Sequence, residues 1–315
     1  MNCFKIIIGV SIIFLFNACV TKTISKEGFI EVDGGKIWYR MDGIGDNTPV
    51  VLLHGGPGAS SLYLEPLIEL SQDRPVIFID QLGCGRSTRI TDTSLMTIDK
   101  NVEQLEQVRK KLHLENFYLY GHSWGTMLGI DYYLKYPKGI KALIFGSPCF
   151  STKMWTNDAD TLISKMPNSI QLIINESIKK KNYASEIFKN AVKAYYKEYL
   201  IRTPISKAKQ DSSDRFSGVN VYEFMWGPSE FKATGNLLTY NRVNDLSKIK
   251  VPTLFTAGEF DEARPTTVKF FQSLVPGAQF KMIPNAGHET MVDNKIENNK
   301  VLRAFLMEMD GRNKK

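Results

Sequence analysis

The stretch LYGHSWGTML, residues 119–128, places Ser123 between two glycines in the pattern Gly-x-Ser-x-Gly. An apolar run, NFYLY, comes directly before Gly121. The segment TMLGIDYYLKYP follows, with apolar residues at helical spacing and a proline at its end. A pattern of five residues occurs by chance in many long chains, so these flanking segments carry the interpretation. Together they predict a strand, a sharp turn and a helix, with Ser123 at the turn.

A serine on a sharp turn between a strand and a helix is the nucleophile elbow of the α/β-hydrolase fold. We expect the elbow to force Ser123 into a strained backbone conformation that exposes its hydroxyl. Gly121 and Gly125 would remove side chains that would otherwise clash there. The spacing of the motif therefore has a steric cause.

Strands and helices alternate on both sides of the elbow. After a hairpin with its turn at 33–35, apolar strands that run into glycine-rich loops are predicted within 49–60 and 75–87, and an amphipathic helix over 98–113. Another strand is predicted within 141–148. Such alternation predicts an α/β fold, a mostly parallel sheet covered by helices on both faces.

The alternation stops between residues 150 and 245. Long segments there, such as SIQLIINESIKKKNYASEIFKNAVKAYYKEYL, predict helices and contain no core strand, and the α/β pattern resumes at VPTLFTAGEFDEARP. We therefore expect an inserted helical cap over the strand ends; a separate domain elsewhere on the surface is the alternative. The expected parts are a signal peptide at 1–18, a first part of the core at 19–149, the cap at 150–245 and a second part of the core at 246–315.

The N-terminus, MNCFKIIIGVSIIFLFNACVTK, differs from the rest of the chain. Its apolar run from Ile6 to Phe16 is shorter than the about 20 residues that span a bilayer, so a secretory signal fits better. The segment LFNAC resembles a bacterial lipobox, although Phe16 and Asn17 depart from its preference for small residues. We expect lipidation of Cys19 and a place in the bacterial cell envelope, anchored to a membrane by lipid; ordinary secretion and an uncleaved anchor are the alternatives.

The composition excludes several other classes of protein. Hydrophobic residues make up 43% and charged residues 23% of the chain, as in globular proteins. The net charge of +7 comes from basic residues scattered among acidic ones, without an arginine-rich stripe, so nucleic acid is not an expected partner. The cysteines have no metal-ligand spacing, and we expect neither a metal nor a cofactor. Cys84 and Cys149 are expected as buried thiols, with a disulfide between them as the alternative.

A serine nucleophile needs a base within hydrogen-bond reach. Of the four histidines, His54 opens a glycine loop, His113 ends a helix and His122 adjoins the serine. His288, which follows the last predicted strand in PNAGH, is therefore the best candidate base.

The base in turn needs an orienting acid. Asp261 follows the strand in VPTLFTAGEF and gives the chain order Ser, Asp, His that this fold requires. Asp80 also ends a strand, but it precedes Ser123 and would break that order. We interpret Asp80 as a carboxylate that organises its own loop.

Attack on a carbonyl builds an oxyanion, which needs preorganised N–H donors. The loop HGGPG can supply the backbone N–H of Gly56, and the elbow that of Trp124. A phosphate-binding loop is the rival interpretation of HGGPG. It is disfavoured because no Gly-Lys-Ser/Thr follows and no Gly-x-Gly-x-x-Gly spacing fits.

Five motifs, HGGPG, DQLGCGRS, GHSWG, GPSEF and GEFDEARP, together resemble those of the proline iminopeptidases, α/β-hydrolase serine aminopeptidases of the tricorn-interacting-factor type. The resemblance covers residues 28–310. It implies an α/β-hydrolase core with a helical cap, and removal of an N-terminal residue, often proline, from short peptides. Matching positions give Ser123, Asp261 and His288 as nucleophile, acid and base. Thr126, where many relatives have a second glycine, and the lipoprotein-like start depart from the family pattern.

An aminopeptidase must also bind the free ammonium group of its substrate. Carboxylates in a partly desolvated pocket attract a cation far more strongly than they do in water. In the family, acids of the GPxEF segment and of the Asp-Glu pair beside the triad serve this role, and they correspond here to Glu230 and Glu262. Two surface acids without this role are the alternative.

Three functions remain open on the sequence: a serine aminopeptidase acting on short peptides with a free N-terminus, an esterase or lactonase on the same scaffold, and a binding protein without turnover. The paired glutamates favour the first over the second, because an uncharged ester gains nothing from them. A complete triad disfavours the third. A haloalkane dehalogenase or epoxide hydrolase would need aspartate at the elbow, where Ser123 stands.

Overall fold

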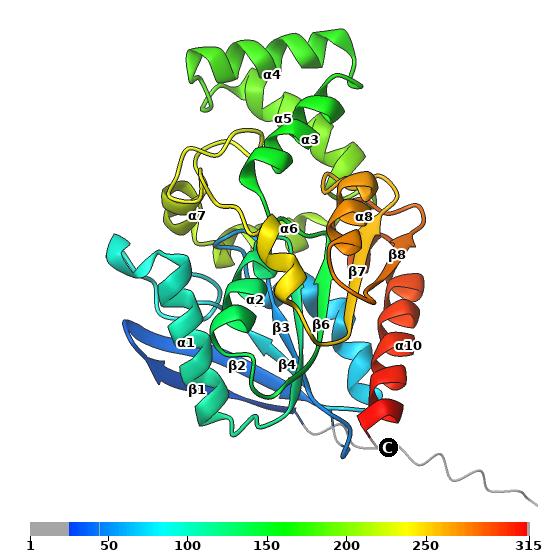
Figure 1. Ribbon diagram of the computed structural model, residues 1–315. Coiled ribbons are helices and arrows are strands. Elements are labelled where there is room, and N and C mark those ends of the chain that lie inside the picture. The colour runs from blue at the N-terminus through cyan, green and yellow to red at the C-terminus, as the bar shows by residue number, and fades with distance from the viewer. Residues whose placement is uncertain (1–24, 44, 314–315) are drawn as a thin grey trace, which may run out of the picture.

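The computed structural model describes residues 25–43 and 45–313, and its centre is a twisted eight-stranded sheet (Figure 1). The strands are β1 Ser25–Val32, β2 Gly35–Asp42, β3 Val50–Leu53, β4 Val76–Ile79, β5 Phe117–His122, β6 Ile140–Gly146, β7 Thr253–Gly258 and β8 Gln279–Ile283. Their order in the sheet is β1-β2-β4-β3-β5-β6-β7-β8. The hairpin β1–β2 is antiparallel and pairs antiparallel with β4, whereas every pair from β4 to β8 is parallel. The predicted α/β fold with a mostly parallel sheet is confirmed.

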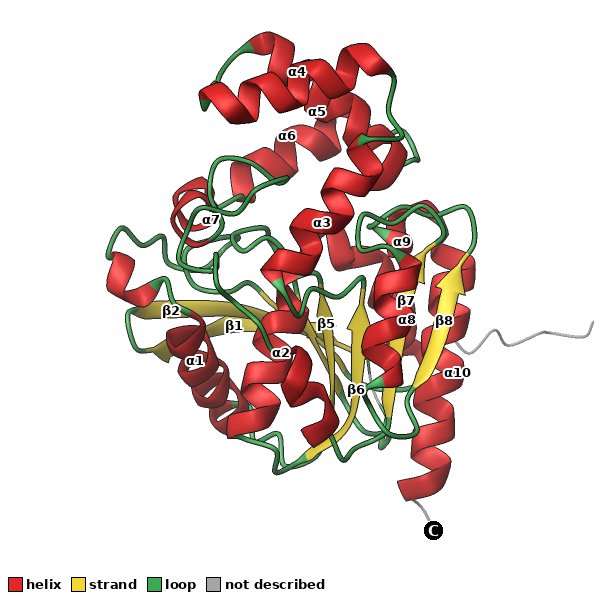
Figure 2. Cartoon of the chain, turned by 45° about the horizontal axis from the view of Figure 1, so that its top comes forward, coloured by secondary structure: helices red, strands yellow, loops and turns green. Residues whose placement is uncertain are grey.

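Helices cover both faces of the sheet (Figures 1 and 2). The α-helices are α1 Ile98–Lys111, α2 Trp124–Lys135, α3 Thr152–Ile163, α4 Asn168–Lys180, α5 Glu186–Tyr199, α6 Lys207–Phe216, α7 Val219–Met225, α8 Pro265–Ser273, α9 Thr290–Asp293 and α10 Lys295–Asn313. The 3₁₀ segments in the described part of the chain are η1 Ser61–Gln72, η2 Thr93–Leu95 and η3 Val243–Lys248. Side chains of α1, α2 and α8 join one buried cluster, and side chains of η1 and α10 join another. The helix predicted over 98–113 is confirmed and ends at Lys111.

The central strands are buried on both faces. All four residues of β3 and all four of β4 are buried, as expected for parallel strands between two helical layers. Alternate residues of β3 point to opposite faces of the sheet. Val51 and Leu53 pack against the layer of α1 and α2, and Val50 and Leu52 pack against the layer of η1 and α10. The sheet therefore holds its strand ends, and the loops that follow them, at fixed positions.

The elbow between β5 and α2 has the strained geometry that the sequence predicts. Ser123 has φ 55° and ψ −123°, a conformation that side chains rarely adopt. A Cβ on Gly121 would lie 2.3 Å from the carbonyl oxygen of Gly125, and a Cβ on Gly125 would lie 2.2 Å from that of Leu53. Both glycines are required because the backbone of the turn packs against itself and against β3.

The chain between β6 and β7 forms a helical insertion that lies over the carboxyl ends of the strands (Figures 1 and 2). It contains α3 to α7, and its α3, α4 and α5 pack around their own buried cluster. The segments that enter and leave it meet at a β-bridge between Ser151 and Asn241. Hydrogen bonds join it to core loops, among them Gly218 N–H to the Gly58 carbonyl at 2.7 Å. These contacts place the insertion at the end of the sheet where Ser123 lies.

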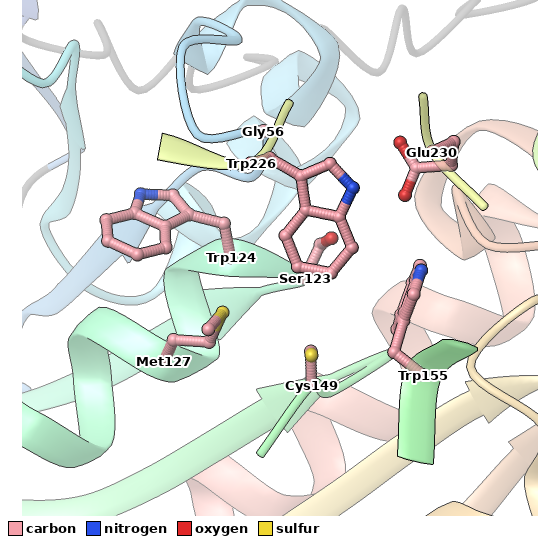
Figure 3. A pocket seen from close by; sticks show the side chains of 8 residues that line it. All are labelled: Gly56, Ser123, Trp124, Met127, Cys149, Trp155, Trp226 and Glu230. Carbon is pink, nitrogen blue, oxygen red and sulfur yellow. The ribbon is translucent and has the colours of Figure 1, made fainter. Parts of the chain in front are cut away.

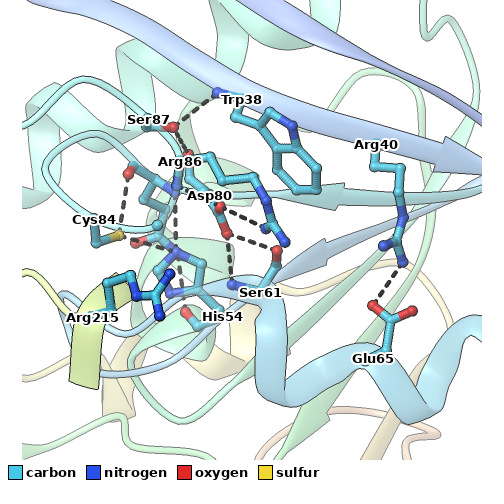
Figure 4. Close-up of polar contacts among 12 residues, drawn as sticks. Trp38, Arg40, His54, Ser61, Glu65, Asp80, Cys84, Arg86, Ser87 and Arg215 are labelled. Carbon is cyan, nitrogen blue, oxygen red and sulfur yellow. Dashed lines mark hydrogen bonds and ion pairs between the residues drawn. The ribbon is translucent and has the colours of Figure 1, made fainter. Parts of the chain in front are cut away.

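Asp80 organises its own loop, as predicted (Figure 4). One oxygen of its fully buried carboxylate accepts hydrogen bonds from the N–H and the hydroxyl of Ser61, each at 2.7 Å. The other accepts from the backbone and the guanidinium of Arg86, at 2.9 and 3.3 Å. The carboxylate therefore joins the start of η1 to the loop after β4.

Cys84 and Cys149 are free buried thiols, so the disulfide alternative is wrong. The predicted signal segment and Cys19 lie outside the described residues. Among the residues described, no helix is both long and apolar enough to cross a membrane.

Candidate active site

Ser123 lies at the wall of a pocket under the helical insertion (Figure 3). The carboxyl end of β5 brings the serine to this level, and α3 and the segment after α7 cover it. The lining residues are Gly56, Ser123, Trp124, Met127, Cys149, Trp155, Trp226 and Glu230. The pocket thus combines a serine, backbone from two glycine-rich turns, an apolar wall and one acid.

The structure brings His288 and Asp261 together at the carboxyl ends of β8 and β7. His288 Nδ1 lies 2.7 Å from Asp261 Oδ1, and both side chains are buried. A carboxylate can only accept at this contact, so Nδ1 carries the proton and Nε2 keeps a lone pair. This is the tautomer that a general base needs.

The Asp261 carboxylate is held by three further donors. Its Oδ2 accepts from the Ser147 hydroxyl at 2.6 Å and from the Gly258 N–H at 3.0 Å, and its Oδ1 accepts from the Ala263 N–H at 2.8 Å. Ser147 follows β6 with φ 48° and is fully buried. These bonds fix the direction in which the carboxylate presents Oδ1 to His288.

The ring of His288 lies between aromatic neighbours. Its centroid is 4.7 Å from that of His122 and 5.5 Å from that of Trp155. Among the described residues no hydrogen bond joins the His288 ring to the Ser123 hydroxyl. Contacts of this kind are often long before substrate binds and shorten in the complex, so the geometry remains consistent with a base for Ser123.

Both predicted oxyanion-hole residues lie in the pocket wall beside Ser123 (Figure 3). Trp124 is the first residue of α2, and the first N–H groups of a helix have no acceptor within it. The Trp124 indole donates to Gln81 Oε1 at 2.7 Å, and the Gln81 amide donates to the His54 carbonyl at 3.0 Å. Gln81 therefore ties the elbow to the loop that carries Gly56.

The two predicted ammonium-binding acids lie near the triad. Glu262 is 4% exposed, and its Oε1 lies 3.9 Å from His288 Nε2. Its Oε2 has no hydrogen-bond partner among the described residues. Glu230 lines the pocket and accepts a hydrogen bond from the Tyr222 hydroxyl. The predicted triad, oxyanion-hole and ammonium-binding residues therefore all lie at one site in the described part of the chain.

Burial makes ionisation of these acids costly. It raises the pKa of Glu262 well above its usual value, and the charges of Glu230 and Asp261 raise it further. Burial also raises the pKa of Glu230, against the opposing effect of the Tyr222 hydroxyl. A bound cation would relieve both acids, because an opposite charge favours the ionised form.

Sequence reasoning missed the apolar wall of the pocket. Met127, Cys149, Trp155 and Trp226 come from four separate segments. The rings of Trp155 and Trp226 meet edge to face at 6.1 Å, although they come from distant segments of the insertion. Only the position of Met127, one turn after Ser123 on α2, offered a signal.

The sequence model described as the alpha/beta hydrolase fold matches residues 48–295. A proline iminopeptidase of Heyndrickxia coagulans is 39% identical over 284 residues, which cover 89% of this chain and 98% of that protein. The crystal structure of the Mycobacterium smegmatis proline iminopeptidase superposes with a TM-score of 0.84 at 26% identity, over 90% of this chain and 99% of that one. The crystal structure of VinJ gives the same TM-score at 28% identity and the same coverage.

Proposed function

The chain belongs to the α/β-hydrolases and, among them, to the proline iminopeptidase family, and we propose that Ser123, Asp261 and His288 perform its chemistry while Glu230 and Glu262 select its substrates. It is a serine hydrolase with prolyl aminopeptidase activity, which releases an N-terminal residue, preferentially proline, from short peptides. An esterase or lactonase on the same scaffold is the alternative.

One observation carries the choice of a substrate with a free N-terminus. Glu262 is a buried acid with one carboxylate oxygen that lacks a partner among the described residues, and its other oxygen lies 3.9 Å from His288 Nε2. A buried polar oxygen without a partner is costly, so we expect a polar group of the substrate to pair with it. A substrate ammonium group satisfies it and places the first peptide carbonyl within reach of the reaction centre.

The chemistry proceeds through an acyl-enzyme. His288 Nε2 accepts the proton of Ser123 as the hydroxyl oxygen attacks the carbonyl carbon, and the N–H groups of Gly56 and Trp124 stabilise the oxyanion. The tetrahedral intermediate collapses, the C–N bond breaks, and His288 returns the proton to the leaving amine. Water then attacks the ester carbonyl with His288 again as base, which releases the amino acid and restores Ser123.

The shape of the pocket supports a compact apolar residue at the N-terminus. Met127, Cys149, Trp155 and Trp226 provide the apolar part of the wall of the pocket that Ser123 and Glu230 also line (Figure 3). We expect the pyrrolidine ring of an N-terminal proline to lie against this wall, with its nitrogen toward Glu230 and Glu262. A longer charged side chain would have to bury its charge against the tryptophans.

A substrate panel tests the proposal. Purified protein should be offered prolyl, alanyl and lysyl amides, their N-acetylated forms, and simple esters. We expect kcat/KM to be highest for the prolyl amide and to fall sharply on acetylation. Equal turnover of free and acetylated amides, or a preference for esters, would favour the esterase alternative.

For localisation, we propose that the protein is held in the bacterial cell envelope by a lipid on Cys19. The support is the sequence alone: a short apolar run that ends in NAC, outside the described residues. The active site, at the carboxyl ends of the strands, would then act on peptides outside the cytoplasm.

A further inference from the structure

Tyr63, on η1, and His122, directly before Ser123, form a chain of hydrogen bonds beside the reaction centre that the triad does not use. The Tyr63 oxygen lies 2.6 Å from the backbone nitrogen of Gly55 and 2.8 Å from His122 Nδ1. His122 Nε2 lies 2.9 Å from the carbonyl oxygen of His288. Three short contacts therefore connect the loop of Gly56 with the loop of the candidate base.

The direction of every bond in this chain is determined. The His288 carbonyl can only accept, so His122 Nε2 carries the proton and its Nδ1 must accept. Tyr63 is then the donor to Nδ1, and its oxygen accepts from the Gly55 N–H. Burial, with repulsion from His288, lowers the pKa of His122 to about 3, which keeps the ring in this neutral form. Burial also raises the pKa of the Tyr63 phenol, which keeps its proton.

Both ends of the chain touch groups whose position decides the rate. Gly55 directly precedes Gly56, the expected oxyanion donor, and a Cβ on Gly55 would lie only 3.0 Å from the Ser123 Cβ. At the other end, the accepting carbonyl belongs to His288 itself. A small displacement of either end moves a reacting group out of its productive geometry.

We propose that Tyr63 and His122 are positioning residues that hold the oxyanion loop and the loop of His288 at a fixed distance from each other across the nucleophile. Neither side chain is assigned a contact with substrate. The inference rests on the serine-hydrolase mechanism proposed above, but not on the choice between peptides and esters. Its effect should therefore be the same for both substrate types.

The test compares Tyr63→Phe, which removes one oxygen and keeps the ring, with the wild type. We expect kcat to fall about tenfold for a prolyl amide and for a simple ester, because loss of the hydroxyl breaks two hydrogen bonds and leaves the Gly55 N–H and His122 Nδ1 unpaired. KM should stay within twofold. Binding of an aminoacyl boronic acid, which mimics the tetrahedral intermediate, should weaken by the same factor as kcat/KM.

A second variant and a control separate positioning from general destabilisation. His122→Gln removes the ring nitrogen that accepts from Tyr63. Because both substitutions break the same contact, the double variant Tyr63→Phe/His122→Gln should be no slower than the slower single variant. Tyr118→Phe removes a buried hydroxyl that donates to Asp310 at 2.8 Å, at the opposite end of β5 from Ser123. It should lower the melting temperature and leave kcat unchanged.

Several outcomes would overturn the proposal. They are a kcat of Tyr63→Phe within twofold of the wild type, losses that multiply in the double variant, or an equal loss of kcat in Tyr118→Phe. If Tyr63→Phe does not fold, His122→Gln must show the loss of kcat at unchanged KM by itself. If Tyr63→Phe slows the amide reaction and leaves the ester reaction unchanged, the proposed positioning role is wrong. If the wild type cleaves esters and ignores amides, the aminopeptidase assignment fails while this test still applies.

Discussion

The backbone N–H of His288 donates a 2.8 Å hydrogen bond to the carbonyl of Tyr199, the last residue of α5. The next residues continue the contact, because the Glu289 N–H donates to the Leu200 carbonyl at 2.9 Å. The helical insertion therefore does more than cover the pocket. It holds the backbone of the candidate base directly.

Asp293 strengthens this link and gives the first prediction. Its carboxylate accepts the N–H groups of Gly287, Arg202 and Thr203, at 2.7 to 3.1 Å. We expect Asp293→Ala to lower the free energy of unfolding by about 2 kcal/mol, because it leaves partly buried donors unpaired. Urea denaturation measures this, and kcat should fall with it.

A matched control for Asp293 lies on α6 of the same insertion. Asp211 pairs with Lys207 on the exposed surface, and such pairs contribute about 0.5 kcal/mol or less. Asp211→Ala should therefore leave both stability and kcat nearly unchanged. Equal effects of the two substitutions would show that Asp293 does not link the insertion to the His288 loop.

The second prediction concerns the nucleophile. Ser123→Ala should abolish turnover and labelling by a fluorophosphonate while the fold remains intact, because the hydroxyl is the group that forms the acyl-enzyme. Circular dichroism and melting temperature provide the control for folding. Activity within tenfold of the wild type would remove Ser123 from the mechanism.

The third prediction concerns the two acids. Glu230→Gln or Glu262→Gln should lower kcat/KM for a prolyl amide by roughly 10²-fold, since hydrogen bonds to charged groups contribute about 1.5–3 kcal/mol. Simple esters should be cleaved at nearly the wild-type rate, because they present no ammonium group. Acetylation of the substrate nitrogen should harm the wild type far more than either variant. Equal losses on esters and amides would contradict the proposed ammonium site.

The fourth prediction concerns stability and pH. Burial, to which the charge of Asp293 adds, raises the pKa of Glu289 to about 8. The folded protein therefore keeps a proton that the unfolded chain releases near pH 4.5. The contribution of Glu289 is fully present below about pH 4.5 and is lost as the pH rises toward 8. The free energy of unfolding should fall over this range.

Glu289→Gln should flatten that dependence, by at most about 1.4 kcal/mol for each pH unit. Glu262 titrates in the same direction, so the informative quantity is the difference between variant and wild type. Glu31→Gln, at an exposed position on β1, is the control. Parallel curves for the wild type and Glu289→Gln would contradict a raised pKa at this side chain.

The fifth prediction concerns the anchor. Cys19→Ala should release the protein from the membrane fraction of a bacterial host, because lipidation requires the thiol. Mass spectrometry of the wild type should find a lipid-modified Cys19 as the first residue. An unmodified Cys19, or a chain that still begins at Met1, would refute the anchor.

The sequence by itself determined the elbow and the chain order of the candidate triad. Ser123 is recognisable because strand, turn and helix are neighbours in the chain, and the strain at φ 55° follows from that local geometry. Asp261 and His288 each follow a predicted strand, and the parallel sheet brings the ends of β7 and β8 to one edge. The GPSEF and Asp-Glu motifs likewise marked Glu230 and Glu262 through a family resemblance.

Tertiary structure alone decided which distant side chains complete the site. Trp155 and Trp226 meet only because the insertion folds back on itself, and Tyr63 reaches His122 only because η1 packs beside the end of β5. The link from Tyr199 to His288 likewise joins the insertion to a core loop. Local sequence patterns record propensity and periodicity, whereas these contacts depend on distances between segments far apart in the chain. Those distances are set by the packing of the whole molecule.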